Sequence, residues 1–144
     1  MINKSIWLKG IKTKASQELK ENIKTDILII GGGITGITTS YFLKDSKSQV
    51  TLVDAGKIAH GQSSNTTGKL TYLQGLIYNK IESTYDKDTA IKYLTSQKEA
   101  IDIVKDIIIE NNIKCDFESN NSFVFTNKDS EINKLIKTEE ILKY

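Results

Sequence analysis

The first clear hydrophobic pattern is a block of consecutive apolar residues, followed by glycines and then by apolar positions at helical spacing. Residues 26–30 read Asp-Ile-Leu-Ile-Ile, and three of the four apolar side chains are β-branched. Such a run predicts a strand that is buried on both faces of a parallel sheet. From Ile34 the apolar spacing through Phe42 predicts a helix that ends between residues 45 and 48.

A second apolar block completes a supersecondary unit. Residues 50–53, Val-Thr-Leu-Val, predict a short strand that ends at Asp54. A strand, a helix and a strand in such quick succession indicate a βαβ unit with parallel strands. The following segment, 56–68, is rich in Gly, Ser, Thr and Asn and predicts a long loop. Loops of this length inside compact domains commonly bind a ligand.

The second half of the chain has helical periodicity. Asp86 or Asp88 is placed to cap a helix whose apolar residues recur every three or four positions until a break near residues 111–112. Residues 114–118 and 122–126 predict two short strands, and a last helix is expected from about residue 129. The predicted fold class is α/β: a Rossmann-like βαβ unit with helices and a small strand pair, in an incomplete three-layer sheet.

A glycine motif lies between the first strand and the first helix. Gly31, Gly33 and Gly36 fit G-x-G-x-x-G, in which the three glycines allow a tight exit from the strand, close approach of a phosphate, and close packing of helix on strand. Gly32 adds further freedom. The amides that open the helix, at the positive end of its dipole, form a site for a pyrophosphate.

Asp54 follows the motif by about twenty residues, where the acid that binds a ribose is expected. This interpretation requires its carboxylate to point toward the glycine turn. The alternative is a tight turn that binds nothing, with Asp54 as a solvated strand end. An acid here favours a free 2′-hydroxyl over a 2′-phosphate, so NADP is disfavoured, whereas FAD and NAD both stay open.

Residues 26–69 resemble the start of the D-amino-acid oxidase and glycine oxidase family of FAD-dependent oxidoreductases. Beyond the glycine turn, the resemblance rests on the small polar loop at 55–69, which in that family wraps the FAD pyrophosphate and approaches the flavin. Within the family, the closest likeness is to bacterial members that carry a C-terminal Rieske iron–sulfur domain. Four stretches carry this likeness: Ser5-Ile-Trp-Leu8, Thr66-Thr-Gly-Lys69, Gly75-Leu-Ile-Tyr78 and Cys115-Asp-Phe-Glu118.

The resemblance implies FAD as cofactor and a set of cofactor-binding residues. The backbone of the glycine turn would contact the pyrophosphate, Asp54 the adenosine ribose, and the polar loop the flavin side, while the resemblance assigns no catalytic residue and no metal ligand. The complete set is Gly31, Gly32, Gly33, Ile34, Thr35, Gly36, Asp54, Ala55, Gly56, Ser63, Ser64, Thr66, Thr67, Gly68 and Lys69.

The amino-acid composition and charge of the chain limit its possible binding partners. All twenty basic residues are lysines, interleaved with eighteen acidic residues to a net charge of +2, which makes no basic face for nucleic acid. No segment has the profile of a membrane span or of a secretory signal, and a single cysteine is compatible with the cytoplasm. We expect Cys115 to be buried and inert, and His60 to lie near the cofactor without a role in proton transfer.

The sequence therefore predicts an N-terminal arm, 1–25, and the N-terminal part of an FAD-binding domain, 26–144, in a fragment or truncated product. The expected activity is that of an FAD-dependent oxidoreductase whose flavin accepts a hydride from a small amine or amino-acid substrate. A Rieske cluster requires two cysteines and two histidines, so any such domain belongs to a full-length parent. The alternatives are a fragment of an NAD-binding Rossmann dehydrogenase and a non-catalytic nucleotide-binding truncation.

Overall fold

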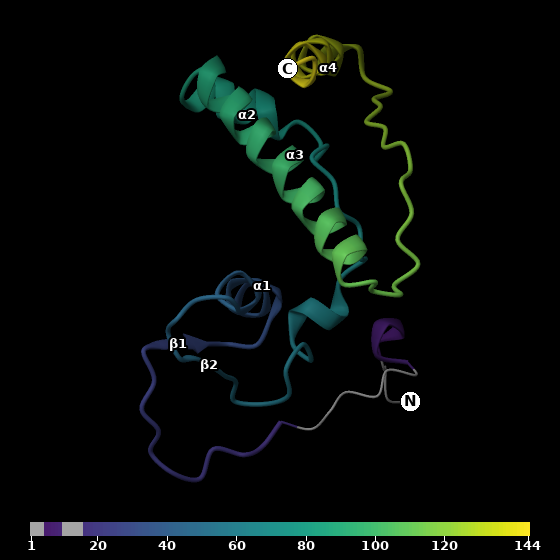
Figure 1. Cartoon of the computed structure of the whole chain (residues 1–144). Coiled ribbons are helices and arrows are strands. Elements are labelled where there is room, and N and C mark those ends of the chain that lie inside the picture. Colours follow the sequence, from purple (N-terminus) through teal and green to yellow (C-terminus); the bar gives the residue numbers. More distant parts are fainter. Residues whose placement is uncertain (1–4, 10–15) are drawn as a thin grey trace. The chain divides into compact units, whose positions relative to one another are not determined.

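The structure is a computed structural model that describes residues 5–9 and 16–144. The chain divides into two compact units, Met1–Gly68 and Lys69–Tyr144, and each unit is described by itself (Figure 1). The predicted arm, 1–25, lies partly outside the described residues.

The first unit contains the predicted βαβ arrangement. Strand β1 (Ile27–Ile30), helix α1 (Ile34–Phe42) and strand β2 (Val50–Val53) follow one another, and the two strands pair in parallel with Ile27 opposite Val50. Both strands are confirmed. The helix begins where the spacing predicts and ends a few residues before the predicted range.

Helix α1 covers one face of this two-stranded sheet. Ile27 and Ile29 are half-buried, whereas the side chains of Leu28 and Ile30 are 53% and 81% exposed. Alternate side chains of a strand point to opposite faces, so the pattern shows that the second face is uncovered. The prediction that β1 is buried on both faces is wrong for the described chain, because a single helix packs on the sheet.

Two short 3-10 helices complete the first unit. One, η1 (Ile6–Leu8), follows Ser5, and the other, η2 (Gln62–Asn65), lies inside the predicted loop 56–68. The loop therefore contains one turn of local structure, and it contacts η1.

The second unit is a group of three helices, α2 (Ile77–Thr84), α3 (Lys87–Glu110) and α4 (Asp129–Leu142). Its core consists of one residue of α2, two of α3 and one of α4: Tyr78, Ala90, Leu94 and Ile141. Helices α3 and α4 were predicted, and Asp86 caps α3 by accepting the Thr89 amide hydrogen at 2.6 Å. Helix α2 was not predicted.

The predicted strands at 114–118 and 122–126 do not form. Phe123 and Phe125 are 81% and 89% exposed, so nothing described packs on the side chains that a strand would place on one face. An isolated two-stranded hairpin is marginally stable in water without such packing. Cys115 in the same segment is exposed, and the expectation that it is buried is wrong.

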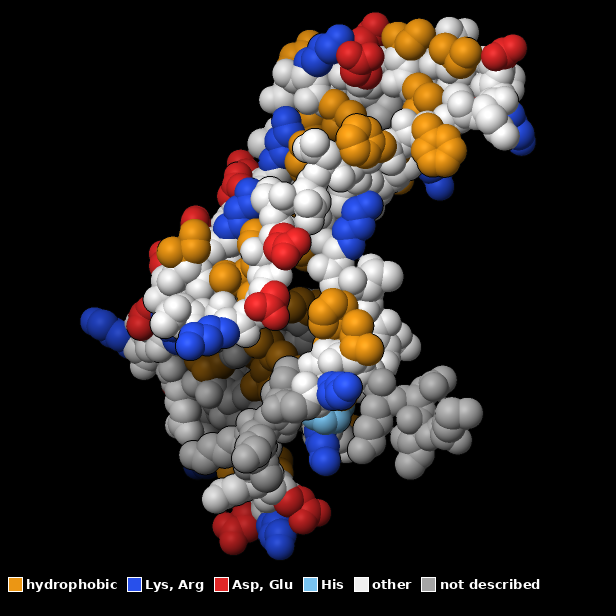
Figure 2. All heavy atoms as spheres, turned by 90° about the vertical axis from the view of Figure 1, so that its right-hand side faces the viewer, with side chains coloured by type: hydrophobic (Ala, Val, Ile, Leu, Met, Phe, Trp, Pro, Cys, Tyr) orange, Lys and Arg blue, Asp and Glu red, His pale blue; other side chains and the backbone are white. Residues whose placement is uncertain are grey.

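Figure 2 shows lysine side chains interspersed with Asp and Glu over the side that it presents. Within residues 5–9 and 16–144, no helix is long and apolar enough to cross a membrane.

Candidate functional site

The glycine turn joins β1 to α1 in the first unit. Gly31 has a φ of +106°, a left-handed conformation that favours glycine, and its amide donates to the Val53 carbonyl at 2.8 Å. Gly33 is the N-cap of α1, and its carbonyl accepts from Ile37 at 3.0 Å. The amides of residues 34–36 therefore have no acceptor within the helix, which is the usual state of a helix N-terminus.

Close packing against backbone requires glycine at position 36, whereas at Gly32 the nearest atom is the end of the Ile58 side chain. A Cβ at Gly36 would lie 1.9 Å from the Gly31 carbonyl oxygen, and a Cβ at Gly32 would lie 2.4 Å from Cδ1 of Ile58. The tight exit expected at Gly31 and the close helix–strand packing expected at Gly36 are both confirmed. Gly33 has more room, since its Cβ would lie 3.2 Å from the Ser63 hydroxyl.

The Asp54 carboxylate points toward the turn, as the sequence interpretation requires. Oδ2 accepts the Gly32 amide hydrogen at 2.7 Å, and Oδ1 accepts that of Gly56 at 2.7 Å. The Gly32 bond and then the Gly56 bond lower the pKa of the Asp54 carboxyl below its ordinary value. The carboxylate is therefore ionised at neutral pH and is held at the mouth of the turn.

The polar loop folds back over the same turn. The Ala59 amide donates to the Gly32 carbonyl at 2.8 Å, and the Ser63 hydroxyl oxygen accepts the Ile34 amide hydrogen at 2.8 Å. Ser63 thus supplies the acceptor that α1 lacks, because its N-cap glycine has no side chain. The loop, the turn and the strand end form one hydrogen-bonded assembly.

The remaining predicted residues differ in what they contact. Ser64 is buried, and its hydroxyl donates to the Gly61 carbonyl, while the Thr66 hydroxyl accepts from the Gly68 amide. Ala55 and Thr67 are exposed, and Lys69 opens the second unit. Ser63 is therefore the loop hydroxyl that reaches the turn, and those of Ser64 and Thr66 shape the loop itself.

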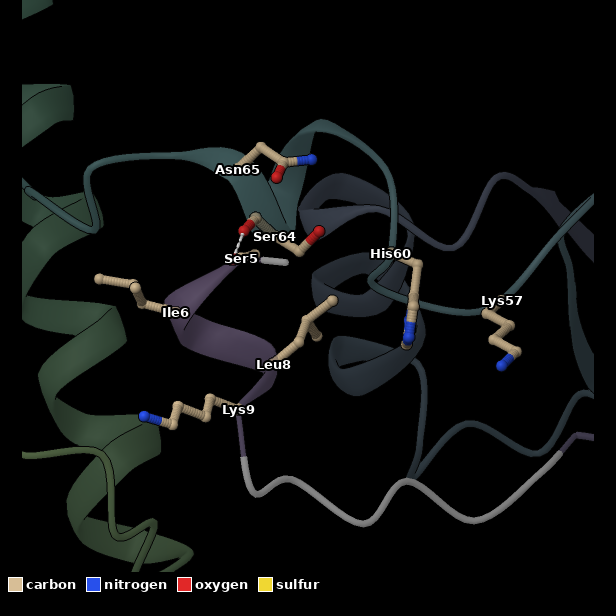
Figure 3. Close-up of a pocket in the computed structure, with 8 residues that line it drawn as sticks. All are labelled: Ser5, Ile6, Leu8, Lys9, Lys57, His60, Ser64 and Asn65. Carbon is tan, nitrogen blue, oxygen red and sulfur yellow. Dashed lines mark hydrogen bonds between the residues drawn. The ribbon is translucent and has the colours of Figure 1, made fainter. Parts of the chain in front are cut away.

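A cavity of about 670 Å³ lies between η1 and the loop (Figure 3). Leu8 and His60 extend into the space between the two segments. His60 donates through Nδ1 to the Ile58 carbonyl at 2.9 Å, which occupies one of its two ring nitrogens. The complete lining is Ser5, Ile6, Leu8, Lys9, Lys57, His60, Ser64 and Asn65.

Sequence reasoning missed three contributors to this site. Ile58 and Ala59 pack and hydrogen-bond on Gly32, and Trp7 contacts the end of the loop. Apolar Ile58 in an otherwise polar loop was the available signal for the first of these. In the part of the chain that the structure describes, no group of three His, Cys, Asp or Glu side chains could hold a metal ion.

Comparison with protein families identifies the chain. The model of the family DAO, described as FAD dependent oxidoreductase, matches residues 26–143. The chain belongs to this family. The match begins at the residue before β1 and runs through the glycine turn, Asp54 and the polar loop, so the resemblance inferred from those residues is confirmed.

Two curated proteins are similar to this oxidoreductase-family chain. It is 30% identical over 129 residues to the "Putative Rieske 2Fe-2S iron-sulfur protein YhfW" of Bacillus subtilis strain 168, covering 90% of this chain and 25% of that protein. It is 29% identical over 109 residues to gamma-glutamylputrescine oxidoreductase of Escherichia coli K12, covering 76% of this chain and 26% of that protein. The chain thus spans about a quarter of the length of these relatives. No solved structure matches it significantly.

Proposed function

We propose that the first unit binds FAD and contributes the cofactor site of an oxidoreductase that acts on an amine or amino-acid substrate. The observation that carries the proposal is the Asp54 carboxylate bonded to the Gly32 amide at the N-terminal end of α1. A carboxylate that could accept from a ribose hydroxyl, beside amides that could donate to a diphosphate, supports this proposal.

The pyrophosphate would bind the amides of Gly33, Ile34, Thr35 and Gly36. The backbone of Gly31 and Gly32 would form the turn around it, while the Gly32 amide keeps its bond to Asp54. Ser63 now accepts the Ile34 amide hydrogen, so a phosphate oxygen at that amide would replace the serine oxygen. A hydroxyl both donates and accepts, and the displaced Ser63 would donate to the same phosphate. The dipole of α1 favours the negative charge at this end.

The adenosine ribose would bind Asp54. Each carboxylate oxygen has two lone pairs and accepts one amide hydrogen in the structure, which leaves capacity for the 2′-hydroxyl. Ala55 and Gly56 follow directly and would line the same part of the site. A 2′-phosphate would instead meet an ionised carboxylate, which disfavours NADP.

The flavin side would be formed by the polar loop. Its proposed members are Ser63, Ser64, Thr66, Thr67, Gly68 and Lys69. Hydroxyls, backbone amides and an ammonium group are donors to the carbonyl and nitrogen acceptors of a flavin, and they set its orientation. When bound, the flavin supplies the hydride-accepting chemistry.

The substrate class and the electron partner rest on the relatives. One relative is named for gamma-glutamylputrescine, which supports an amine-type substrate. The other is named as a Rieske 2Fe-2S protein, which supports an iron–sulfur domain as a partner of the flavin in a longer parent. Neither relative's name assigns a catalytic residue in this chain.

A competition titration tests the proposal. The purified 144-residue chain is titrated with FAD while the flavin fluorescence is followed, and bound FAD is then challenged with NAD and with AMP. We expect saturable FAD binding that a large excess of NAD displaces poorly, since the polar loop serves the flavin half. Tighter binding of NAD than of FAD, or no binding of FAD, would overturn the proposal.

A further inference from the structure

Ser5 and Trp7, at the start of the described chain, are attached to the polar loop by two side-chain hydrogen bonds. The Ser5 hydroxyl donates to the Ser64 carbonyl, and the indole Nε1–H of Trp7 donates to the Thr66 carbonyl at 2.7 Å. Each bond joins residues 59 apart in the sequence. The two acceptors are two residues apart in the loop, and both carbonyls point toward residues 5–7. Figure 3 shows the Ser5–Ser64 bond at the edge of the cavity.

The Trp7 ring also fixes the end of the loop. A Cβ at Gly68 would lie 2.8 Å from Cζ2 and 2.9 Å from Cη2 of Trp7, so the indole lies directly against the Gly68 backbone. Gly68 has a φ of +70°, which independently favours glycine. Both the backbone conformation and the contact with Trp7 therefore depend on glycine at this position.

The loop is held from two sides as a result. On one side, the Ser63 hydroxyl is bonded to the first amide of α1. On the other, the carbonyls of Ser64 and Thr66 are bonded to Ser5 and Trp7. Among the residues that the structure describes, Ser64 and Thr138 are the buried polar side chains, and the burial of Ser64 is consistent with a loop that is enclosed between two neighbours.

We propose that Ser5 and Trp7 are positioning residues that hold the loop 61–68 in the conformation that binds FAD. This inference rests on the proposed function, since it assigns the two residues a role in that same site. A loop whose carbonyls are fixed before binding loses less conformational freedom when the cofactor binds, which strengthens binding without new contacts. Neither side chain needs to touch the cofactor.

The test compares four variants with the unaltered 144-residue chain. Ser5→Ala removes the bond to the Ser64 carbonyl and the local bond that the hydroxyl accepts from the Trp7 amide at 3.3 Å. Ser5→Thr restores a hydroxyl for both bonds. Trp7→Phe keeps an aromatic ring but removes the indole N–H. Ser46→Ala is the matched control, because its hydroxyl bonds only locally to the Ser48 carbonyl in the connection after α1. FAD affinity, the visible absorption spectrum of the bound flavin at saturation, and hydrogen exchange of the amides at 64–68 without FAD are measured.

We expect Ser5→Ala and Trp7→Phe to weaken FAD binding by roughly three- to tenfold each, because each removes one hydrogen bond to a carbonyl of the loop. Ser5→Thr restores the affinity and Ser46→Ala leaves it unchanged. The two weakened variants also exchange the 64–68 amides faster. They shift the spectrum of the bound flavin at saturation as well, and this shift is the readout that a purely stabilising role would not produce.

Two outcomes overturn the inference, and they are distinguishable. If the unaltered chain binds FAD and both variants bind it equally well with the same spectrum, the positioning role is wrong while the FAD site stands. If the unaltered chain binds no FAD, the proposed function fails and the positioning role fails with it.

Discussion

Oδ2 of Asp54 accepts the amide hydrogen of Gly32 at 2.7 Å across 22 residues of sequence. The bond joins the carboxyl ends of the two parallel strands, one at the glycine turn and one at the start of the polar loop. A similar bond closes the other end of the sheet, where Asp26 accepts the Gln49 amide hydrogen at 2.7 Å. Each aspartate accepts an amide hydrogen beside the other strand, but Asp54 also accepts that of Gly56 and lies at the proposed cofactor site.

Replacing Asp54 by Ala should weaken FAD binding by roughly tenfold or more, because a charge-assisted acceptor for the ribose is lost. Asp26→Ala is the control, since it removes a carboxylate–amide bond from the opposite end of the sheet, whereas Asp54→Ala removes the bonds to Gly32 and Gly56. FAD affinity measured by fluorescence titration should fall in Asp54→Ala and stay close to the original in Asp26→Ala. Equal effects of the two changes would show that Asp54 acts through stability alone.

Acid should reduce the stability of the first unit through Asp54. Amide bonds lower the pKa of Asp54 in the folded chain from its ordinary 3.8, so the folded state binds fewer protons than the unfolded state in this range. The contribution of Asp54 is therefore present above about pH 3.8 and is lost as the pH falls through the lower folded value. The thermal unfolding midpoint should fall as the pH is lowered from neutral through this acidic range. The fall should be smaller in Asp54→Asn than in the original chain.

Gly36→Ala should destabilise the first unit by about 1–3 kcal/mol, as expected for an overpacked contact. The added Cβ would lie 1.9 Å from the Gly31 carbonyl oxygen, so α1 must move away from β1. Gly56→Ala is the control, because its Cβ would lie 3.6 Å from Asp54 Oδ1, an ordinary contact. Urea unfolding of both variants checks this, and a Gly36→Ala chain as stable as Gly56→Ala would contradict the packing described.

Alkaline pH should destabilise the second unit through Tyr78. Burial raises the pKa of Tyr78 from 10.0 to about 12, so its contribution is present below pH 10 and is lost as the pH rises toward 12. Tyr78→Phe should reduce this loss, whereas Tyr85→Phe, at a side chain 72% exposed, should not. The comparison is made by urea unfolding at several pH values, and identical slopes in both variants would refute the assignment.

The parts of the fold that sequence predicts best are those fixed by local chemistry. The β-branched runs of β1 and β2, the glycine turn and the Asp86 cap each depend on a few adjacent residues, and each was predicted. The strands expected at 114–118 and 122–126 depend on a partner that covers Phe123 and Phe125, and the described residues supply none. Helix α2 was missed because its short sequence is stabilised by packing on α3 and α4, most of all through Tyr78.

The candidate site shows the same division. The positions of Gly31, Gly36 and Asp54 follow from motif spacing, and the structure brings all three together. The spacing could not show which hydroxyl of the loop reaches α1, since Ser63 and Ser64 are adjacent and similar. Trp7 could not be placed from the sequence either, because its bond to Thr66 spans 59 residues without a periodic pattern.

An NMR titration of the isotopically labelled chain with FAD tests the central claim most directly, since each backbone amide reports separately. The account predicts that the largest shifts occur at the amides of Gly33, Ile34 and Thr35, that Asp54→Ala reduces them, and that amides in α3 stay unchanged. Binding of FAD that leaves the amides of the glycine turn unshifted would contradict it.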